Sequence, residues 1–305
     1  MSDEKPKNYE TEWSFSFSNL GESISNLLGS LGVDTDAEVE TATFSEAIDG
    51  AENALITLDL AMGETTVGTL VDSDNLLEAE TAYIGETSFE TRAEDNRKMV
   101  RLGQKIQGGA WQPIKDALGS FNKRKDLYWH VKLSPNLPLD LTINHGMTES
   151  TFDLSELQLT ELKINGGAGR SHIKVPTMGE RYHIDLNNGV GELGLELLDG
   201  ADVEMRINNG TGKTTVTIGA NASVSAKIAG GVGECVIKLP ADAAVSLKAS
   251  SGLGKIDVPD HFEAVKVDQF VAISGRWETP GFADAENQIT LKYDGGVGAL
   301  RIVTG

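Results

Sequence analysis

Apolar and polar residues alternate along most of the chain, and the alternation repeats at a fixed interval. Its clearest marker is a Gly-x-Gly pair, whose first glycine recurs after 22, 21, 21 and 21 residues, and once more after 44, twice 22. An interval of this length is typical of repeat proteins whose units stack on one another. The six pairs are Gly167 and Gly169, Gly189 and Gly191, Gly210 and Gly212, Gly231 and Gly233, Gly252 and Gly254, and Gly296 and Gly298.

The apolar residues keep the same phase as the glycines. In one repeat, Val203, Met205 and Ile207 alternate with polar residues before the glycine pair, and Thr214 and Val216 take the inward positions after it. Alternation with a period of two predicts half-buried β-strands, and the glycines predict tight turns between them. A single repeat cannot bury its apolar face, whereas stacked repeats can. We therefore expect an all-β fold, a parallel β-solenoid of about ten coils of 21–22 residues.

The charged residues follow the same register. The residue after each second glycine faces outward by alternation, and in five successive repeats it is basic and acidic in turn. In a parallel, in-register stack these residues become neighbours of opposite charge, and a slip of one repeat would bring like charges together. The predicted inter-coil charge ladder consists of Arg170, Glu192, Lys213, Glu234 and Lys255.

The repeat divides the chain into four predicted segments. In the second of them, Gly63 and Gly85 open the related motifs GETTV and GETSF, which are separated by one repeat interval. The segments are residues 1–50, an N-terminal segment; residues 51–92, N-terminal coils; residues 93–127, an irregular basic excursion; and residues 128–305, the main Gly-x-Gly solenoid.

Residues 18–32 place leucine and isoleucine at helical spacing, which predicts a short amphipathic helix. Such a helix could shield the open end of the solenoid as a cap. Two alternatives are contact with a partner and binding at a membrane surface, although the polar face lacks the lysines and arginines that membrane-surface helices carry.

Residues 93–127 are locally basic in an acidic chain. They could contact an acidic protein partner or a phosphorylated lipid, or they could pack on the solenoid with their charges solvated. A second irregular stretch, residues 274–288, is expected to be a loop, and Gly275 lies about where a further repeat should begin. The basic residues of the candidate interaction surface are Arg97, Lys98, Arg101, Lys105, Lys123, Arg124 and Lys125.

Composition narrows the range of partners. The net charge of −20 argues against nucleic acids and against direct binding to an anionic membrane, since both need a basic face. The single cysteine, Cys235, excludes an internal disulfide. With neither a signal peptide nor an 18-residue apolar run in view, we expect a cytoplasmic protein that could associate peripherally with a membrane.

The string NGTGKTTVT at residues 209–217 is similar to a nucleotide-binding P-loop. A P-loop needs a glycine at the position of Ile207 and a helix after the lysine, whereas the residues after Lys213 alternate as a strand. We expect the string to be one turn of the repeat and the chain to bind no nucleotide. The five histidines show no ligand spacing and Cys235 occupies an inward position, so we predict neither an enzyme nor a cofactor or metal site.

The longer strand patterns resemble those of the toast-rack β-strand-repeat proteins, a group that includes LiaF-type C-terminal domains and adhesin-like repeat proteins. The resemblance rests on LDLTINHGMTESTFDLSELQLTELKINGGAG (139–169), on NNGVGELGLEL and GGVGECVIKLP, and on WETPGFADAENQITLKYDGGVGALRIV (277–303). Residues 54–86 resemble the N-terminal toast-rack region. The resemblance implies a non-enzymatic scaffold or sensor linked to bacterial envelope stress, with a protein partner that could be an envelope membrane protein.

The sequence thus favours a β-solenoid that acts through protein–protein interaction. The alternative is a carbohydrate-binding, adhesin-like or carbohydrate-active β-helix. Its glycan groove would use the outward residues His172, Lys174, Thr215, Thr217 and Asp257.

Overall fold

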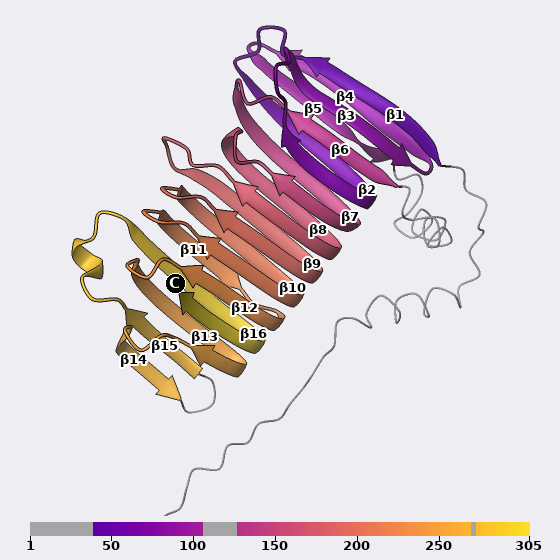
Figure 1. The fold of residues 1–305 in the computed structure, drawn as a ribbon. Helices are drawn as coiled ribbons and strands as arrows, with labels where there is room; N and C mark the ends of the chain where they lie inside the picture. The colour runs from indigo at the N-terminus through magenta and orange to yellow at the C-terminus, as the bar shows by residue number, and fades with distance from the viewer. Residues whose placement is uncertain (1–38, 106–126, 270–272) are drawn as a thin grey trace, which may run out of the picture. The chain divides into compact units, whose positions relative to one another are not determined.

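The computed structural model describes residues 39–105, 127–269 and 273–305 (Figure 1). They belong to one compact unit made of Glu38–Lys105 and Lys125–Gly305. This described part contains a sheet of 16 strands and a short 3-10 helix, η3 (Phe282–Asp284). The expectation of an all-β fold is confirmed. The helix predicted over residues 18–32 lies outside the described residues.

Four long strands form the middle of the sheet, and each pairs in parallel with the next along the chain. Ile164 lies beside Leu186, its counterpart in the next repeat, and Leu186 lies beside Ile207 of the repeat after that. The sequence repeat is therefore the pairing register of the strands. The strands are β7 (Pro138–Asp153), β8 (Gln158–Val175), β9 (Tyr182–Leu197) and β10 (Asp202–Ile218).

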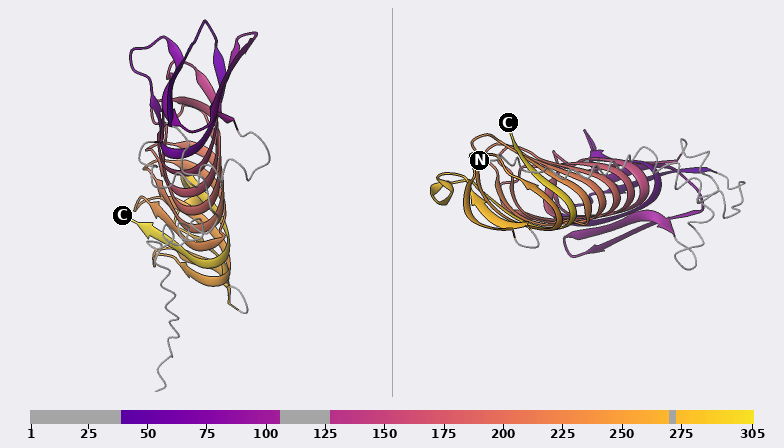
Figure 2. Two further views of the ribbon diagram at one scale, coloured as in Figure 1. Left: turned by 90° about the vertical axis from the view of Figure 1, so that its right-hand side faces the viewer. Right: turned by 90° about the horizontal axis from the view of Figure 1, so that it is seen from below.

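Each of these strands continues through its glycine bend, so that one strand has two paired halves. In β10 the halves on either side of Gly210 both pair with β9. Figure 2 shows neighbouring strands of the stack curving in the same sense, one behind another. Alternate residues point inward, and Val203, Ile207 and Val216 are fully buried. Inward residues of all the stacked strands join in one continuous hydrophobic core, and each fully buried aliphatic side chain contributes about 1.5–3 kcal/mol.

The N-terminal end of the sheet departs from the parallel repeat. Strand β2 pairs in parallel with β7 on one side, and on the other its two halves pair with β5 and β6. Antiparallel partners then follow, β4 on β5, β3 on β6 and β1 on β3. The strands are β1 (Glu40–Ala47), β2 (Asn53–Thr69), β3 (Asn75–Tyr83), β4 (Glu86–Glu94), β5 (Arg97–Lys105) and β6 (Tyr128–Leu133).

Two expectations for this end are therefore wrong in part. Of the N-terminal coils expected over residues 51–92, only β2 joins the parallel stack, and Gly85 lies between the antiparallel strands β3 and β4. Residues 97–105, expected in the irregular excursion, form strand β5. The reason is that Val100 and Leu102 alternate with charged residues and are buried against β2.

The C-terminal end changes the order of the stack. Strand β16, the last in the chain, lies between β11 with β12 on one side and β13 on the other, parallel to all of them. An antiparallel hairpin of β14 and β15 then covers the first half of β13. The strands are β11 (Ser223–Ala229), β12 (Val232–Leu239), β13 (Ala244–Asp257), β14 (Glu263–Gln269), β15 (Ile273–Glu278) and β16 (Gln288–Thr304).

Gly275 consequently does not begin a further repeat. It lies in β15, opposite Ala249 of β13, in an antiparallel pair. The loop expected over residues 274–288 is correct only beyond Glu278, where η3 and its flanking turns lead into β16. In the described part of the chain, the parallel stack contains fewer repeats than the ten or so predicted. They are, in spatial order, β2, β7, β8, β9, β10, β11 with β12, β16 and β13.

Candidate functional site

The glycine pairs stack directly on one another at the bends. At Gly210 an added Cβ atom would lie 2.0 Å from the carbonyl oxygen of Gly189, and at Gly212 it would lie 1.8 Å from that of Gly191. Gly212 also has a φ of +140°. Only glycine permits this approach of two backbones, and at the second position only glycine adopts the conformation at low cost. The pairs are thus structural turns in these repeats.

The P-loop-like string is one such bend. Gly210, Gly212 and Lys213 lie within strand β10, which continues to Ile218. The hydroxyl of Thr214 is buried and donates a hydrogen bond of 2.8 Å to Oδ1 of Asn209. A hydroxyl held inward in this way is not presented to a phosphate-bound metal ion, which is the role it has in a P-loop.

The charge ladder exists over four of its five predicted members. Arg170 Nε lies 3.0 Å from Glu192 Oε2, and Lys213 Nζ lies 3.2 Å from Glu234 Oε2. Glu192 and Lys213 are also neighbours by register. Glu149 extends the ladder by one strand, with its Oε1 at 3.5 Å from Arg170 Nη1. All of these side chains are partly exposed, so each pair contributes a few tenths of a kcal/mol to about 1 kcal/mol.

Lys255 is not the fifth member, and this prediction is wrong. Strand β16 separates β12 from β13, so Ala299 lies beside both Glu234 and Lys255. Lys255 Nζ instead contacts Asp257 Oδ1 of its own strand at 2.6 Å. Arg301 of β16 supplies a second cation to Glu234, at 3.6 Å. Glu234 and Lys255 thus alternate in charge along the sequence although their strands are not neighbours in the sheet.

A second ladder, made of asparagines, was not predicted. Nδ2 of each asparagine donates a hydrogen bond to Oδ1 of the asparagine one strand earlier, at 2.6, 2.9 and 2.7 Å. The first amide of the row donates to Oδ1 of Asp59 in β2, at 2.7 Å. The signal was present in the sequence as an asparagine two positions before Gly146 and before each of the first three glycine pairs. The asparagines are Asn144, Asn165, Asn187 and Asn208.

The predicted basic interaction surface is engaged within the molecule where the structure describes it. Arg97 contacts Asp140 at 3.0 Å and Arg101 contacts Asp59 at 2.8 Å. Lys98 is buried between Glu46 at 2.5 Å and Asp49 at 2.7 Å. Burial lowers the pKa of Lys98, but the two carboxylates outweigh this effect and the net direction is upward. These three residues link β5 to β7, β1 and β2. The side chain of Lys105, and Lys123, Arg124 and Lys125, lie outside the described part.

Of the five histidines, His145 is buried and the other four are exposed. It is 8% exposed, and its ring nitrogens lie 3.1 Å from Thr148 Oγ1 and 3.4 Å from Ser171 Oγ. Its ring also packs edge-on against Phe152, with the centroids 5.6 Å apart. Burial lowers the pKa of His145 to about 4, so the ring is neutral at pH 7.

Cys235 lies in the inward column, as expected. It is 3% exposed, and burial, with a contribution from the charge of Glu234, raises its thiol pKa to about 12. Nucleophilic cysteines need a thiolate and access to solvent, and Cys235 has neither. Its position is that of a small core residue.

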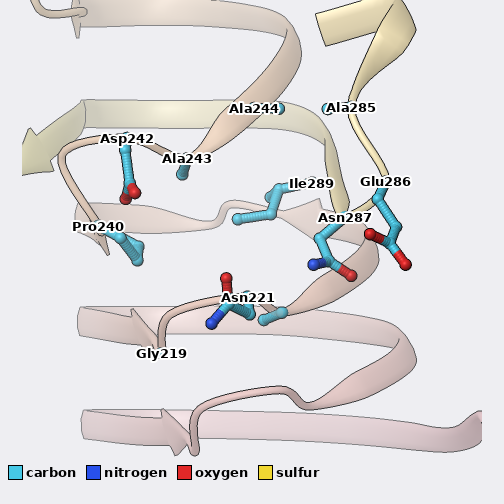
Figure 3. Close-up of a pocket in the computed structure, with 11 residues that line it drawn as sticks. Gly219, Asn221, Pro240, Asp242, Ala243, Ala244, Ala285, Glu286, Asn287 and Ile289 are labelled. Atoms are coloured by element: carbon cyan, nitrogen blue, oxygen red, sulfur yellow. The ribbon is translucent and has the colours of Figure 1, made fainter.

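A pocket of about 180 Å³ opens where β16 enters the stack (Figure 3). The loop from Pro240 to Ala243 must pass over the place that β16 occupies, and this detour leaves space beneath it. Asp242 and Glu286 come from separate loops on opposite sides of the pocket in Figure 3. This arrangement does not bring the two carboxylates together as an acid–base pair.

The remaining outward residues do not converge either. His172, Thr215 and Asp257 share one outward column of the second half-strands, and Lys174 and Thr217 share the next. Among the described residues, no group of three or more histidine, cysteine, aspartate or glutamate side chains is placed to hold a metal ion. None of the described helices is long and apolar enough to cross a membrane.

Several strand edges are uncovered in the described part of the chain, including the outer sides of β1, β4 and β14, and a further one lies on β13. The outer side of residues 253–257, here called the β13 edge, pairs with no described strand, because β15 covers only Ser246–Ser251. Leu253 on this edge is 71% exposed. Ile256 and Val258 are only half-buried, although their counterparts in the other repeats are buried. Within the described part of the chain, the hydrophobic core is therefore less covered at this point than in the other repeats.

Comparison with solved structures finds low-identity matches over most of the chain. A Clostridium sporogenes protein described as a cell adhesion protein matches at 17% identity and a TM-score of 0.43, covering 88% of this chain and 100% of its own. A Bacteroides fragilis protein described as an adhesin matches at 10% identity and a TM-score of 0.36, covering 89% of this chain and 100% of its own. A Parabacteroides merdae protein described as an adhesin matches at 12% identity and a TM-score of 0.31, covering 88% of this chain and 98% of its own. No curated protein sequence matches the chain.

A family model settles the relationship that these structures leave open. The model for the N-terminal domain of toast_rack, DUF2154, matches residues 34–196. This range is more than half of the chain and includes the antiparallel N-terminal strands together with the first repeats of the parallel stack. The chain therefore belongs to the toast-rack family.

Proposed function

We propose that this protein is a non-enzymatic scaffold or sensor domain that acts through protein–protein interaction. The observation that carries the proposal is the β13 edge, where a strand edge without a described partner strand, an exposed leucine and two half-buried core positions coincide. An extended segment of a partner could add to this edge as a further strand. Its backbone would satisfy the unpaired groups, and its apolar side chains would cover Ile256 and Val258.

The fold proposed for this scaffold is a β-solenoid. A strand of 16 residues, such as β9, pairs in parallel with β10, which begins only five residues after β9 ends. Parallel pairing after so short a connection requires the chain to return to its starting side within each repeat.

Other properties support the remaining parts of the proposal. The buried positions of His145 and Cys235 support a structural use of these groups and a protein without catalysis. The toast-rack resemblance supports bacterial envelope stress as the setting and an envelope membrane protein as the partner. In that setting the protein would act at the cytoplasmic side, held at the membrane by its partner.

The test is a binding assay with the full chain as bait for envelope membrane proteins. The variant Leu253→Lys with Ile256→Lys should lose the partner, because two charges would block strand addition. Val71→Lys is the matched control, since Val71 is 78% exposed and lies outside the β13 edge. Equal recovery of the same partner by parent and edge variant would contradict the proposal. Sedimentation of the parent alone distinguishes a second copy of this chain from a different protein.

A further inference from the structure

Six basic residues form one unbroken column on the outward face of the first half-strands. The register places Arg206 beside Lys227, Lys227 beside Lys292, and Lys292 beside Lys248. The hairpin continues the column, since Lys248 lies opposite Arg276 and Arg276 opposite Lys266. All six residues are exposed. The strands that carry this basic stripe are β10, β11, β16, β13, β15 and β14, and they are neighbours in the sheet (Figure 1).

The basic stripe opposes the charge pattern found elsewhere in the molecule. The ladder of Arg170, Glu192, Lys213 and Glu234 alternates in sign, whereas the basic stripe places like charges on adjacent strands, which is destabilising. Asp294 and Glu278 offset part of this repulsion through Lys292 at 2.9 Å and Arg276 at 2.6 Å. This row of like charges costs stability even though the whole chain has a net charge of −20, and a negatively charged ligand bound along the row would offset that cost.

The geometry of the basic stripe selects a linear ligand. Neighbouring strands lie about 4.8 Å apart, so six strands span roughly 24 Å with one cation at each step. A linear polymer with an anionic group on each unit could meet several of these cations at once. Each further contact then adds to affinity without a new cost of association.

The neighbours of the basic stripe distinguish between polyanions. Ser225 and Thr290 lie two positions before Lys227 and Lys292, on the same face, and offer hydroxyl groups. The residues two positions before and after every member of the basic stripe are non-aromatic. Single-stranded nucleic acids are bound mainly by stacking of bases on aromatic side chains. Hydroxyl groups beside cations instead suit sugars that carry carboxylates or sulfates.

We propose that the basic stripe is a binding site for a linear anionic polysaccharide. This site shares no residue with the β13 edge and does not depend on the protein–protein interaction proposed above. It also differs from the glycan groove considered from the sequence, whose residues lie on the second half-strands. The polysaccharide would lie across the strands, parallel to the stacking direction, with its anionic groups over successive cations.

The experiment measures binding of polygalacturonate to the full chain by calorimetry at two salt concentrations. The parent should bind, more weakly at the higher salt concentration, and should not bind dextran, which is neutral. Lys227→Glu with Lys248→Glu should weaken binding by roughly tenfold or more. Arg92→Glu with Lys238→Glu is the matched control, because it makes the same change of charge at exposed residues outside the basic stripe. Affinity for oligogalacturonates should rise with length until they span roughly 24 Å.

A second readout separates a ligand site from a structural one. Because like charges repel along the column, Lys227→Glu with Lys248→Glu should leave the melting temperature unchanged or raise it while binding is lost. Lys227→Gln with Lys248→Gln should show the same two effects in milder form. Equal affinity of stripe and control variants would overturn the proposal. So would an absence of polygalacturonate binding, including the case in which polyphosphate or single-stranded DNA binds instead.

Discussion

Arg170 and Glu192 lie on adjacent strands, one repeat apart in the sequence, with Arg170 Nε 3.0 Å from Glu192 Oε2. The contact exists because β8 and β9 pair with a register equal to the sequence repeat. It joins a ladder that alternates in sign through Lys213 to Glu234. The ladder favours the native register over one displaced by a repeat, in which like charges would meet.

Reversal of one charge in this ladder should destabilise the fold. Lys213→Glu would place three carboxylates in a row and remove the 3.2 Å contact with Glu234. We expect a loss of about 1 kcal/mol and a small fall in melting temperature, because the side chains are partly exposed. Lys238→Glu, at an exposed position outside the ladder, is the control for net charge and should change stability less. Equal effects of the two substitutions would contradict the role of the ladder.

The bend glycines should tolerate no side chain. Gly212→Ala would place Cβ at 1.8 Å from a carbonyl oxygen and force alanine into a φ of +140°. Because both strands would have to separate, we expect a loss of at least about 4 kcal/mol in chemical denaturation, or failure to fold. Gly179→Ala meets no atom within 4 Å and should be nearly neutral. A mild effect at Gly212 would show that the bends can move apart.

The asparagine ladder should be cooperative. Asn187 donates to Asn165 at 2.9 Å and accepts from Asn208 at 2.7 Å. Asn187→Ala would leave both neighbours without these partners in a half-buried position, so we expect a loss of about 1–3 kcal/mol. Denaturant unfolding of Asn136→Ala provides the comparison, since Asn136 is exposed and outside the ladder. If the two variants are equally stable, water replaces the amide in the ladder at little cost.

Acid should destabilise the protein through His145. Its pKa is about 4 in the folded chain and 6.5 when unperturbed, so the unfolded chain binds a proton first as the pH falls. The free energy of unfolding is therefore unaffected by His145 above pH 6.5, and it falls as the pH is lowered from 6.5 to about 4. The loss amounts to at most about 3 kcal/mol.

Substitution of two histidines can isolate this effect. His145→Gln should flatten the pH dependence of unfolding between pH 6.5 and 4, whereas His172→Gln, at an exposed position, should leave it unchanged. Urea unfolding at several pH values measures both. An unchanged slope in His145→Gln would assign the acid sensitivity to other groups.

Several features of the fold could be predicted because they are local or strictly periodic. The strand type of each half-repeat follows from alternation, and the register of β7 to β10 follows from the interval between glycine pairs. The inward positions of Thr214 and Cys235 were predicted correctly for the same reason. Each of these depends only on which residues share a phase.

Other features depend on which repeats are neighbours in the sheet, and the periodicity of the sequence does not determine this. Every repeat has the same phase, so β12 can stack on β16 or on β13 with the glycines still aligned. The wrong assignment of Lys255 to the charge ladder has this cause, whereas Gly275 was wrongly assigned to a repeat because β15 runs antiparallel to β13. The burial of His145 continues the inward alternation of Leu139, Leu141 and Ile143, so the same phase rule would have placed it in the core.

The candidate sites also depend partly on the local sequence pattern and partly on the order of the strands in the sheet. The sequence by itself determined an all-β repeat, its register and the need for glycine at each bend, because backbone sterics and burial act on every repeat alike. Only the tertiary structure decided that β16 enters the stack before β13, because every repeat has the same phase and the alignment of the glycines permits either order. The same insertion places Lys292 between Lys227 and Lys248, and so creates an unbroken row of cations from residues far apart in the chain.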